Sequence, residues 1–342
     1  MIGKIKNLAW LNLAKSLLGV IGFAISMILA YPALRAEAAY VAYTSPSGAN
    51  LSLWLANDQR LFSKHSLDIR LIYVSGASKS AQAMVSGQVP IALLAGQPVV
   101  DLAATSAERG DLIVVGGVVN VPALYFMVRP EIKDFSDLRK RAVGVTRAGS
   151  TSEFVVTELL RKYNLKPGDE VKIIQTGDTR ASAAMLQQGI IAAAAFSVPM
   201  NLVAEKAGAR VLVDMAQEGI FFPQNSIVTT MDYLRSQRDF LLKFLRAYSE
   251  GVRLMHSNKS AALKSIAAYT KTSDPELLEA TYNYALTFIE KVPTLEVKGL
   301  QKIIDRKNES GPARRVALAD VYDPSLLSEL EQRGFFRSLW AK

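Results

Sequence analysis

The stretch AVGVTRAGSTSEFVVTELLRKY (142–163) decides the fold class of this chain. It begins with a short apolar run typical of a buried strand. A cluster of small hydroxyl residues and glycine follows (146–152), and the stretch ends with helical spacing. The same order of strand, small polar cluster and helix occurs three more times: at 40–43 before TSPSG (44–48), at 69–74 before SGAS (75–78), and at 171–175 before TGDT (176–179).

This repeated order predicts a ligand site at one edge of a sheet. In an open α/β sheet, the carboxyl ends of parallel strands face the ligand crevice, and the next helices begin there. Such loops gather hydroxyl groups and unpaired backbone N–H groups around one point. The arrangement is suited to holding a small polar or anionic molecule without reacting with it.

The order of elements predicts an α/β fold with two lobes. Strands and helices alternate from residue 40 to about residue 213, which indicates mostly parallel sheets with helices on both faces. From Asp232 onward the sequence is nearly all helical. Without residues 1–38, about 300 residues remain, which is more than one hydrophobic core usually supports. One passage recurs at identical spacing and suggests lobes of similar build: Ser80-Ala81 with Gly87 and Val89, and Ser182-Ala183 with Gly189 and Ile191.

Residues 1–38 are predicted to be an export signal. Three lysines precede an uncharged run at 16–30, and Ala36-Glu37-Ala38 matches the small-x-small pattern of signal-peptidase sites. We expect cleavage after Ala38, which would place the mature protein in the periplasm. Retention as an uncleaved anchor is the alternative, because Leu8 to Leu13 could lengthen the apolar run.

The charge of the chain argues against a nucleic-acid partner. The formal net charge is +9, but the lysines and arginines are spread along the sequence, with no basic cluster interleaved with aromatic residues. A mild positive field suits an anionic solute or an acidic membrane surface. We expect the protein to act as a monomer.

The sequence lacks the residues on which metal sites and nucleophilic catalysis usually depend. It has no cysteine and two histidines, His65 in a polar turn and His256 in the helical tail. Neither lies near a serine-rich loop in the expected layout, so we expect no metal, no cofactor and no catalytic residue. The missing cysteine also excludes a disulfide framework and a lipid-attached anchor. A Walker loop is excluded because Ser150 stands where its lysine would be.

Four segments resemble the solute-binding proteins of bacterial ABC importers, in the NMT1/THI5-like group of sulfonate, taurine and nitrate binders and pyrimidine-synthase-like proteins. Their order and spacing agree with that group, and the likeness covers residues 40 to about 230. The segments are SGASKSAQAMVSGQVPIALLAG (75–96), DFSDLRKRAVGVTRAGSTSEFVVTELLRKYNL (134–165), AAMLQQGIIAAAAFSVP (183–199) and AGARVLVDM (207–215).

The resemblance implies a two-lobed periplasmic-binding-protein fold of type II. Each lobe would hold a mixed, mainly parallel sheet, with the ligand cleft between the lobes. The first lobe would comprise residues 39–128 and 229–342, and the second lobe residues 129–228. Tyr125 to Val128 and Ile227 to Thr230 would form the crossings, and the lobes would close on the ligand as rigid bodies.

The loop at 146–152 is the first candidate for holding the ligand. Ser150, Thr151 and Ser152 stand at the start of a predicted helix, where N–H groups are unpaired and the dipole favours negative charge. The alternative is that Thr151 or Ser152 only caps the helix, which is compatible with binding. Arg147 could pair with a sulfonate or carboxylate through its fork of donors, or it could be solvated.

The other candidates follow further predicted strands. Their alternative reading is ordinary turn chemistry, since tight turns use the same residue types. Aromatic residues that could floor the pocket, but could equally be core, are Trp54, Tyr125 and Phe222. The ligand-binding candidates are Ser45, Ser47, Ser75, Gly76, Ala77, Gln97 and Asn120 in the first lobe, and Gly149, Thr179 and Ser197 in the second.

Together these features predict an extracytoplasmic receptor of an ABC importer. It would capture a small anionic solute of the sulfonate, nitrate or carboxylate class and pass it to permease subunits in the inner membrane. An envelope sensor that signals to a membrane partner is the alternative. The resemblance includes the pyrimidine synthases, which depend on a site histidine and a cysteine cluster. This chain has no cysteine and no histidine at 44–50, so we do not expect an enzyme.

Overall fold

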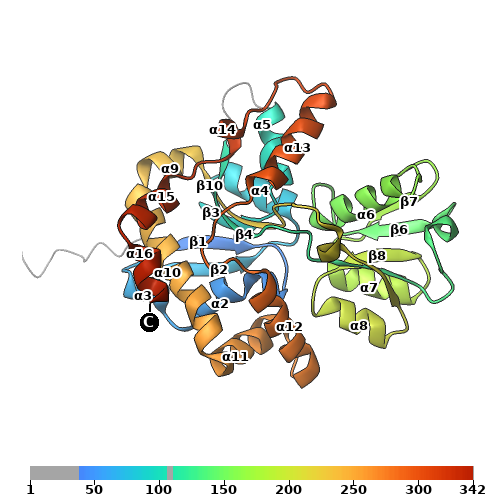
Figure 1. Ribbon diagram of the computed structural model, residues 1–342, viewed down its shortest axis with the longest axis horizontal. Coiled ribbons are helices and arrows are strands. Elements are labelled where there is room, and N and C mark those ends of the chain that lie inside the picture. The colour runs from blue at the N-terminus through green and yellow to red at the C-terminus, as the bar shows by residue number, and fades with distance from the viewer. Residues whose placement is uncertain (1–37, 106–110, 342) are drawn as a thin grey trace, which may run out of the picture. The chain divides into compact units, whose positions relative to one another are not determined.

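The computed structural model describes residues 38–105 and 111–341, so nearly all of the predicted export signal lies outside the described residues. The described chain forms two five-stranded sheets surrounded by helices (Figure 1). This confirms the predicted α/β architecture with two lobes. Within the two described ranges, no helix is long and apolar enough to cross a membrane.

The first sheet has the strand order β2-β1-β3-β10-β4. Strand β1 pairs parallel with β2 and β3, and β10 runs antiparallel between β3 and β4. Four strands therefore share one direction, as expected for a mixed, mainly parallel sheet. The strands are β1 (Ala39–Tyr43), β2 (Ile69–Tyr73), β3 (Ile91–Leu94), β4 (Leu112–Val119) and β10 (Asn225–Thr230).

The second sheet repeats this plan with the order β7-β6-β8-β5-β9. Strand β6 pairs parallel with β7 and β8, and β5 runs antiparallel between β8 and β9. The strands are β5 (Tyr125–Val128), β6 (Ala142–Val145), β7 (Lys172–Gln175), β8 (Ala193–Phe196) and β9 (Arg210–Asp214).

Alternating side chains cover the two faces of the first sheet with separate cores. Val41 and Leu93 pack in one apolar cluster with α2 (Leu51–Asp58) and α10 (Arg238–Ser257). Their neighbours Ala42 and Leu94 point to the opposite face and pack with α4 and α5. We call this sheet and its helices the first lobe. The remaining helices on this side include α3 (Leu61–Lys64), α4 (Ala77–Val85) and α5 (Gln97–Thr105), with the short helix η1 (Gly48–Asn50).

The second sheet, with its helices, forms the second lobe. Helix α6 covers one face and α7 and α8 cover the other (Figure 1). All four residues of β8 are buried, as expected for a strand with helices on both sides. The helices are α6 (Thr151–Lys162), α7 (Thr179–Gln187) and α8 (Met200–Lys206), with the short helices η2 (Phe135–Leu138) and η3 (Met215–Glu218).

The internal repeat seen in the sequence is a repeat of structure. Helices α4 and α7 both have nine residues, and each is followed by a glycine with positive φ, Gly87 at 78° and Gly189 at 76°. Strands β3 and β8 then begin at equal distances after their helices. The two lobes therefore present equivalent helix starts to the region where their strands end.

The predicted crossings between the lobes are wrong by a few residues. Tyr125–Val128 is strand β5, which pairs wholly within the second sheet, and 227–230 belongs to β10 of the first sheet. The connections are instead 120–124 and 215–224, which lie next to these strands. Strands buried in a sheet are as apolar as segments that cross between lobes, so composition alone does not distinguish the two. The exact limits of the lobes remain a prediction.

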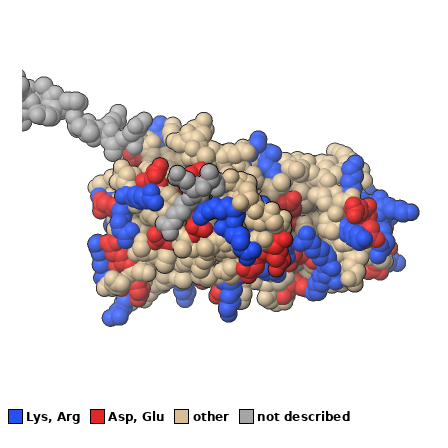
Figure 2. Space-filling model, turned by 90° about the horizontal axis from the view of Figure 1, so that it is seen from above, with Lys and Arg blue, Asp and Glu red and all other residues tan. Residues whose placement is uncertain are grey.

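The chain after residue 230 is mostly helical, as predicted, and it completes the first lobe. Helix α10 packs against α2, and α13 packs against α5. Lys and Arg are interspersed with Asp and Glu on the face shown in Figure 2. The helices are α9 (Met231–Ser236), α10, α11 (Lys259–Thr270), α12 (Pro275–Phe288), α13 (Val297–Glu309), α14 (Leu318–Val321), α15 (Ser325–Gln332) and α16 (Phe335–Trp340).

Candidate ligand-binding site

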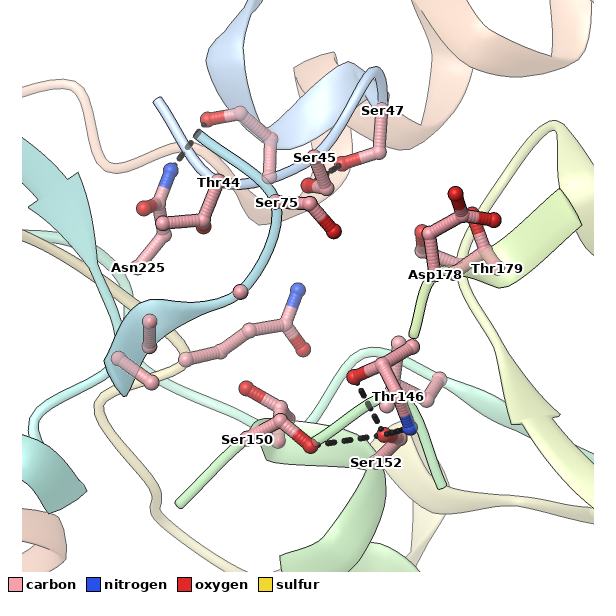
Figure 3. A pocket seen from close by; sticks show the side chains of 18 of the residues that line it. Thr44, Ser45, Ser47, Ser75, Thr146, Ser150, Ser152, Asp178, Thr179 and Asn225 are labelled. Carbon is pink, nitrogen blue, oxygen red and sulfur yellow. Dashed lines mark hydrogen bonds between the residues drawn. The ribbon is translucent and has the colours of Figure 1, made fainter. Parts of the chain in front are cut away.

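A polar cavity lies where strands of the two sheets end facing each other. Thr44 directly follows β1, Thr146 directly follows β6, and Ser197 directly follows β8. The cavity has a volume of about 90 Å³ and is lined by residues of both lobes (Figure 3). The small polar clusters of the sequence therefore do converge on one point.

Ten of the fourteen residues predicted to hold a ligand line this cavity. They come from both lobes, although their role in binding stays a prediction. The ten are Ser45, Ser47, Ser75, Gly76, Ala77, Ser150, Thr151, Ser152, Thr179 and Ser197.

Buried amides fix the loop after β1. The Asn50 side chain donates to the Ser45 carbonyl at 2.8 Å, and the Ser45 and Ser47 hydroxyls lie 3.0 Å apart. Asn225, the first residue of β10, donates to the carbonyl of Ala49 at 2.9 Å and to the Asn50 side-chain oxygen at 3.1 Å. This network fixes the loop and so holds the Ser45 and Ser47 hydroxyls at the cavity wall.

The start of α4 offers backbone donors to the cavity. Gly76 precedes the helix with φ 88° and ψ 139°, a conformation that favours glycine. No side chain in the described chain caps α4, and the first N–H groups of a helix have no intrahelical acceptor. Ala77, the first residue of α4, lines the cavity, so unpaired N–H groups and the positive end of the helix dipole lie at its wall.

Serine 150 both caps α6 and lines the cavity. Its hydroxyl accepts from the Glu153 N–H at 3.2 Å and lies 2.8 Å from the Ser152 hydroxyl. The Ser152 hydroxyl in turn accepts from the Thr146 N–H at 2.9 Å. The helix is therefore capped, but by Ser150 and not by Thr151 or Ser152 as expected, and the hydroxyl of Thr151 is left without a hydrogen bond to any described residue.

The start of α7 brings the one charged side chain of the cavity wall. Asp178 caps the helix by accepting from the Ala181 N–H at 2.8 Å. Among the residues that line the cavity in the described chain there is no Lys, Arg or His. Four serine and threonine hydroxyls of the wall, those of Thr44, Thr151, Thr179 and Ser197, form no hydrogen bond within the described chain. The cavity is therefore a shell of hydroxyls and N–H groups with one carboxylate.

Comparison with known families identifies the chain. The model of the family described as NMT1/THI5 like matches residues 50–262. The chain belongs to the NMT1/THI5-like family. The resemblance inferred from the four sequence segments is thereby confirmed. No curated protein sequence matches the chain.

Solved structures share the fold of this NMT1/THI5-like chain at low identity. The alkanesulfonate-binding protein SsuA of Xanthomonas axonopodis pv. citri, bound to MOPS, has a TM-score of 0.70 and 18% identity, covering 85% of this chain and 99% of its own. The nitrate-binding protein NrtA of Synechocystis PCC 6803 has a TM-score of 0.68 and 12% identity, covering 86% and 88%. The desulfurization enzyme DSZB has a TM-score of 0.60 and 15% identity, covering 86% and 99%. The fold therefore hosts both binding proteins and an enzyme.

Two predicted ligand residues of this NMT1/THI5-like chain lie outside the cavity wall because local partners occupy them. Asn120 is buried and donates to the Glu290 carboxylate at 3.1 Å and to the Thr294 carbonyl at 2.9 Å. Its side-chain oxygen accepts from the Glu296 N–H at 3.0 Å. Gln97 begins α5 and donates to Asp101 at 3.1 Å, and it lines a neighbouring groove.

Arg147 and Gly149 also lie outside the cavity wall. The Arg147 guanidinium reaches toward the first lobe, where Nε donates to the Ser75 carbonyl at 3.2 Å. The Gly149 N–H donates to the Glu153 carboxylate at 2.7 Å. Burial raises the pKa of Glu153, and this hydrogen bond opposes the increase. Arg147 therefore belongs to the contact between the lobes, and Gly149 lies beside this contact, where an added Cβ would come within 3.1 Å of the Ser78 hydroxyl.

Sequence reasoning missed several wall residues. Thr44, Thr146 and Asp178 belong to the same small polar clusters as the predicted residues, so the clusters could have indicated them. Gln224 ends the second connection between the lobes, Asn225 begins β10, and neither carried such a signal. The aromatic candidates do not line the cavity: Trp54 and Phe222 are fully buried in the core, and Tyr73 lines the cavity instead.

The histidines lie away from the cavity. His65 approaches Glu250 at 3.0 Å, and His256 packs edge-on against Trp340. Within the described ranges, no group of three His, Asp or Glu side chains could hold a metal ion. The cavity therefore offers hydrogen bonds but no familiar acid–base pair.

Ion pairs join the lobes outside the cavity. Glu158 of α6 contacts Lys302 at 3.1 Å and Arg306 at 2.7 Å, both on α13. Burial alone would raise the pKa of Glu158, but the hydrogen bonds and charges of Lys302 and Arg306 outweigh it and lower the pKa. Lys206 of α8 contacts Asp274 and Glu276 at the start of α12, at 2.9 and 2.7 Å.

Replacing Glu158 by glutamine is expected to lower the free energy of unfolding by about 1 kcal/mol at neutral pH, because the amide does not attract the two cations. Since the folded-state pKa is lowered, this contribution is present above the ordinary value of 4.5 and is lost as pH falls through the folded value. Urea unfolding of the unsubstituted protein and of Glu158→Gln, at several pH values between neutral and acid, measures the difference in their free energies of unfolding. Exposed Glu331 replaced by glutamine is the control, and a difference that persists unchanged in acid would contradict the ion-pair account.

Proposed function

We propose that this chain is the extracytoplasmic receptor of an ABC importer. It captures a small polar solute between its lobes in the periplasm and delivers it, as a monomer, to permease subunits in the inner membrane. The observation that carries this proposal is the cavity between the two sheets, lined by hydroxyls and unpaired N–H groups. The alkanesulfonate-binding and nitrate-binding proteins of the same fold support this role.

The cavity wall favours binding over catalysis. The desulfurization enzyme shows that the fold can support chemistry. In this chain, however, the wall described by the structure has no histidine, and its one carboxylate, which caps α7 through one oxygen, has no second carboxylate or lysine beside it on the wall. Acid–base catalysis usually depends on such positioned proton donors and acceptors. The wall instead offers many weak donors that can hold a molecule and release it unchanged.

An anionic group in this cavity would be held without a cationic side chain. The start of α4 and the four unpaired hydroxyls are the available donors. Helix starts and hydroxyls bind compact oxyanions well, because several N–H and O–H groups converge on one charge. The small volume fits a sulfonate or carboxylate head group. We therefore place the anionic end of the solute against Ala77 and Thr151.

The wall also offers acceptors, which favour a solute that carries a hydrogen-bond donor. The Gln224 amide nitrogen donates to the Tyr284 hydroxyl at 2.7 Å, and its side-chain oxygen is buried with no partner among the described residues. The Asp178 carboxylate adds a negative charge to the same wall. Burying an unpaired acceptor is costly. An amino- or hydroxy-substituted sulfonate or carboxylate therefore fits better than nitrate, which has no donor.

Thermal unfolding with a panel of small anions tests the proposal. A ligand that binds only the folded state at a hundredfold excess over its Kd stabilises it by about 2.7 kcal/mol. We expect 2-aminoethanesulfonate or a hydroxy acid to raise the Tm, ethanesulfonate to raise it less, and nitrate least. Chloride at equal ionic strength is the control. If every member of the panel behaves like chloride, the proposed solute class is wrong.

A further inference from the structure

A short line of contacts joins the two lobes beside the cavity. The Ser75 hydroxyl donates to the Gly177 carbonyl at 3.0 Å, and the Ser78 hydroxyl donates to the Ala148 carbonyl at 2.5 Å. Arg147 adds its bond to the Ser75 carbonyl. We call residues 75–78, 147–149 and 177 the seam. Ser75 and Gly76 line the cavity and lead directly into α4, so the seam borders the proposed binding groups.

The Arg147 side chain packs tightly in the seam, in addition to donating its hydrogen bond there. A Cβ atom at Gly76 would lie 2.4 Å from the Arg147 Cδ and 3.0 Å from its Nε, so no side chain fits at position 76 while Arg147 keeps its place. On the second-lobe side, a Cβ at Gly177 would lie 3.9 Å from the Arg147 Nη2. The arginine thus passes between glycines of opposite lobes.

The charge of Arg147 is not used in an ion pair within the described part of the chain. It also does not line the cavity, although the sequence placed it among the ligand residues. A guanidinium that reaches across to a backbone carbonyl, and that rests against a glycine with positive φ, is suited to holding one loop against another.

We propose that Arg147 is a positioning residue that sets how far the two lobes close and so holds the start of α4 against the solute. The inference rests on the proposed receptor function. It adds that closure of the two lobes is controlled by a residue that does not touch the solute. Because the arginine occupies the space in which a Cβ of residue 76 would lie, Gly76 and Arg147 act as one unit.

The distance between spin labels in the two lobes tests this inference. The chain has no cysteine, so cysteines introduced at exposed Val85 in the first lobe and exposed Ile190 in the second are the only labelling sites. Pulsed electron–electron double resonance in buffer alone then gives the populations of near and far lobe separations. This readout needs no solute, so it can succeed or fail independently of the solute panel.

We expect Arg147→Ala to shift the ratio of far to near separations about fivefold toward the far state, as the loss of one hydrogen bond would. Gly76→Ala should shift it further, because the added Cβ meets the arginine and the positive φ is strained. The double variant G76A/R147A should recover part of the near state relative to G76A, because the collision is gone.

Arg139→Ala is the matched control, because Arg139 is paired with Glu170 within the second lobe. Its distance distribution should equal that of the unsubstituted labelled protein. Thermal unfolding should show all four variants folded. The inference is overturned if R147A and G76A both leave the distances unchanged, or if the double variant is more open than G76A.

Discussion

Replacing Thr151 by tryptophan is expected to abolish solute binding while leaving the fold intact. Thr151 is the first residue of α6, lines the cavity, and makes no side-chain hydrogen bond to a described residue. An indole cannot share a cavity of about 90 Å³ with a solute. The cap of α6 is Ser150, which stays in place, so the free energy of unfolding should change by less than about 1 kcal/mol. The stabilisation by the best panel solute, about 2.7 kcal/mol at a hundredfold excess over its Kd, should fall to zero.

The control for this variant is Gln82→Trp, which places the same side chain on an exposed position of α4. It should keep the full thermal shift. If Thr151→Trp keeps the shift as well, the solute binds elsewhere. If Thr151→Trp unfolds the protein, Thr179→Trp offers a second test, because Thr179 begins α7 and has an equally unbonded hydroxyl at the cavity wall.

The largest loss of stability is expected from Trp54→Ala. The Trp54 side chain is fully buried in α2, stacks on Tyr269 at 4.7 Å between ring centroids, and meets Tyr43 edge-on at 5.8 Å. Removing a buried tryptophan costs about 3–5 kcal/mol, through lost burial and the cavity left behind. Urea unfolding should show this as a lower midpoint with an unchanged slope.

Trp340→Ala is the matched control for that loss. Trp340 is only partly buried and packs edge-on against His256 at the end of the chain. Its removal should cost clearly less than that of Trp54. Equal losses at the two positions would contradict the packing described for α2. Because Tyr43 ends β1 just before the Thr44 loop, Trp54→Ala should also weaken solute binding beyond its effect on unfolding.

The sequence allowed the fold and the position of the site to be predicted because both depend on local patterns. Each small polar cluster follows a strand directly, so strand direction alone carries Thr44, Thr146 and Ser197 to one edge. The repeated passage that begins at Ser80 and at Ser182 likewise indicates a helix of nine residues followed by a strand of four residues in both lobes.

The failures have a different cause: they depend on contacts between distant parts of the chain. Asn120 was assigned to the site because it follows a strand, but the segment 290–296 covers that strand end and uses its whole amide. Arg147 stands in the right loop but points across the lobes to Ser75. Asn225 was missed because its partners, Ala49 and Asn50, lie about 175 residues earlier.

The helical segment 51–64 shows the same limit on a smaller scale, because it contains no glycine or proline and yet is not one continuous helix. It breaks at Arg60, which adopts a left-handed conformation with φ 55°, and α3 begins immediately afterwards. An arginine gives no sequence signal for such a break, because glycine and asparagine are the usual residues in that conformation. The break turns the chain toward β2 and leaves the end of α2 against Tyr269 and Ser265.

The most direct test of the receptor proposal is native mass spectrometry of residues 39–342 after incubation with the solute that stabilises it best. The proposal predicts one solute molecule per protein chain, and release on denaturation of a molecule with unaltered mass. Failure to observe a complex, or release of a molecule whose mass has changed, would contradict a receptor that binds its solute between two lobes and returns it intact.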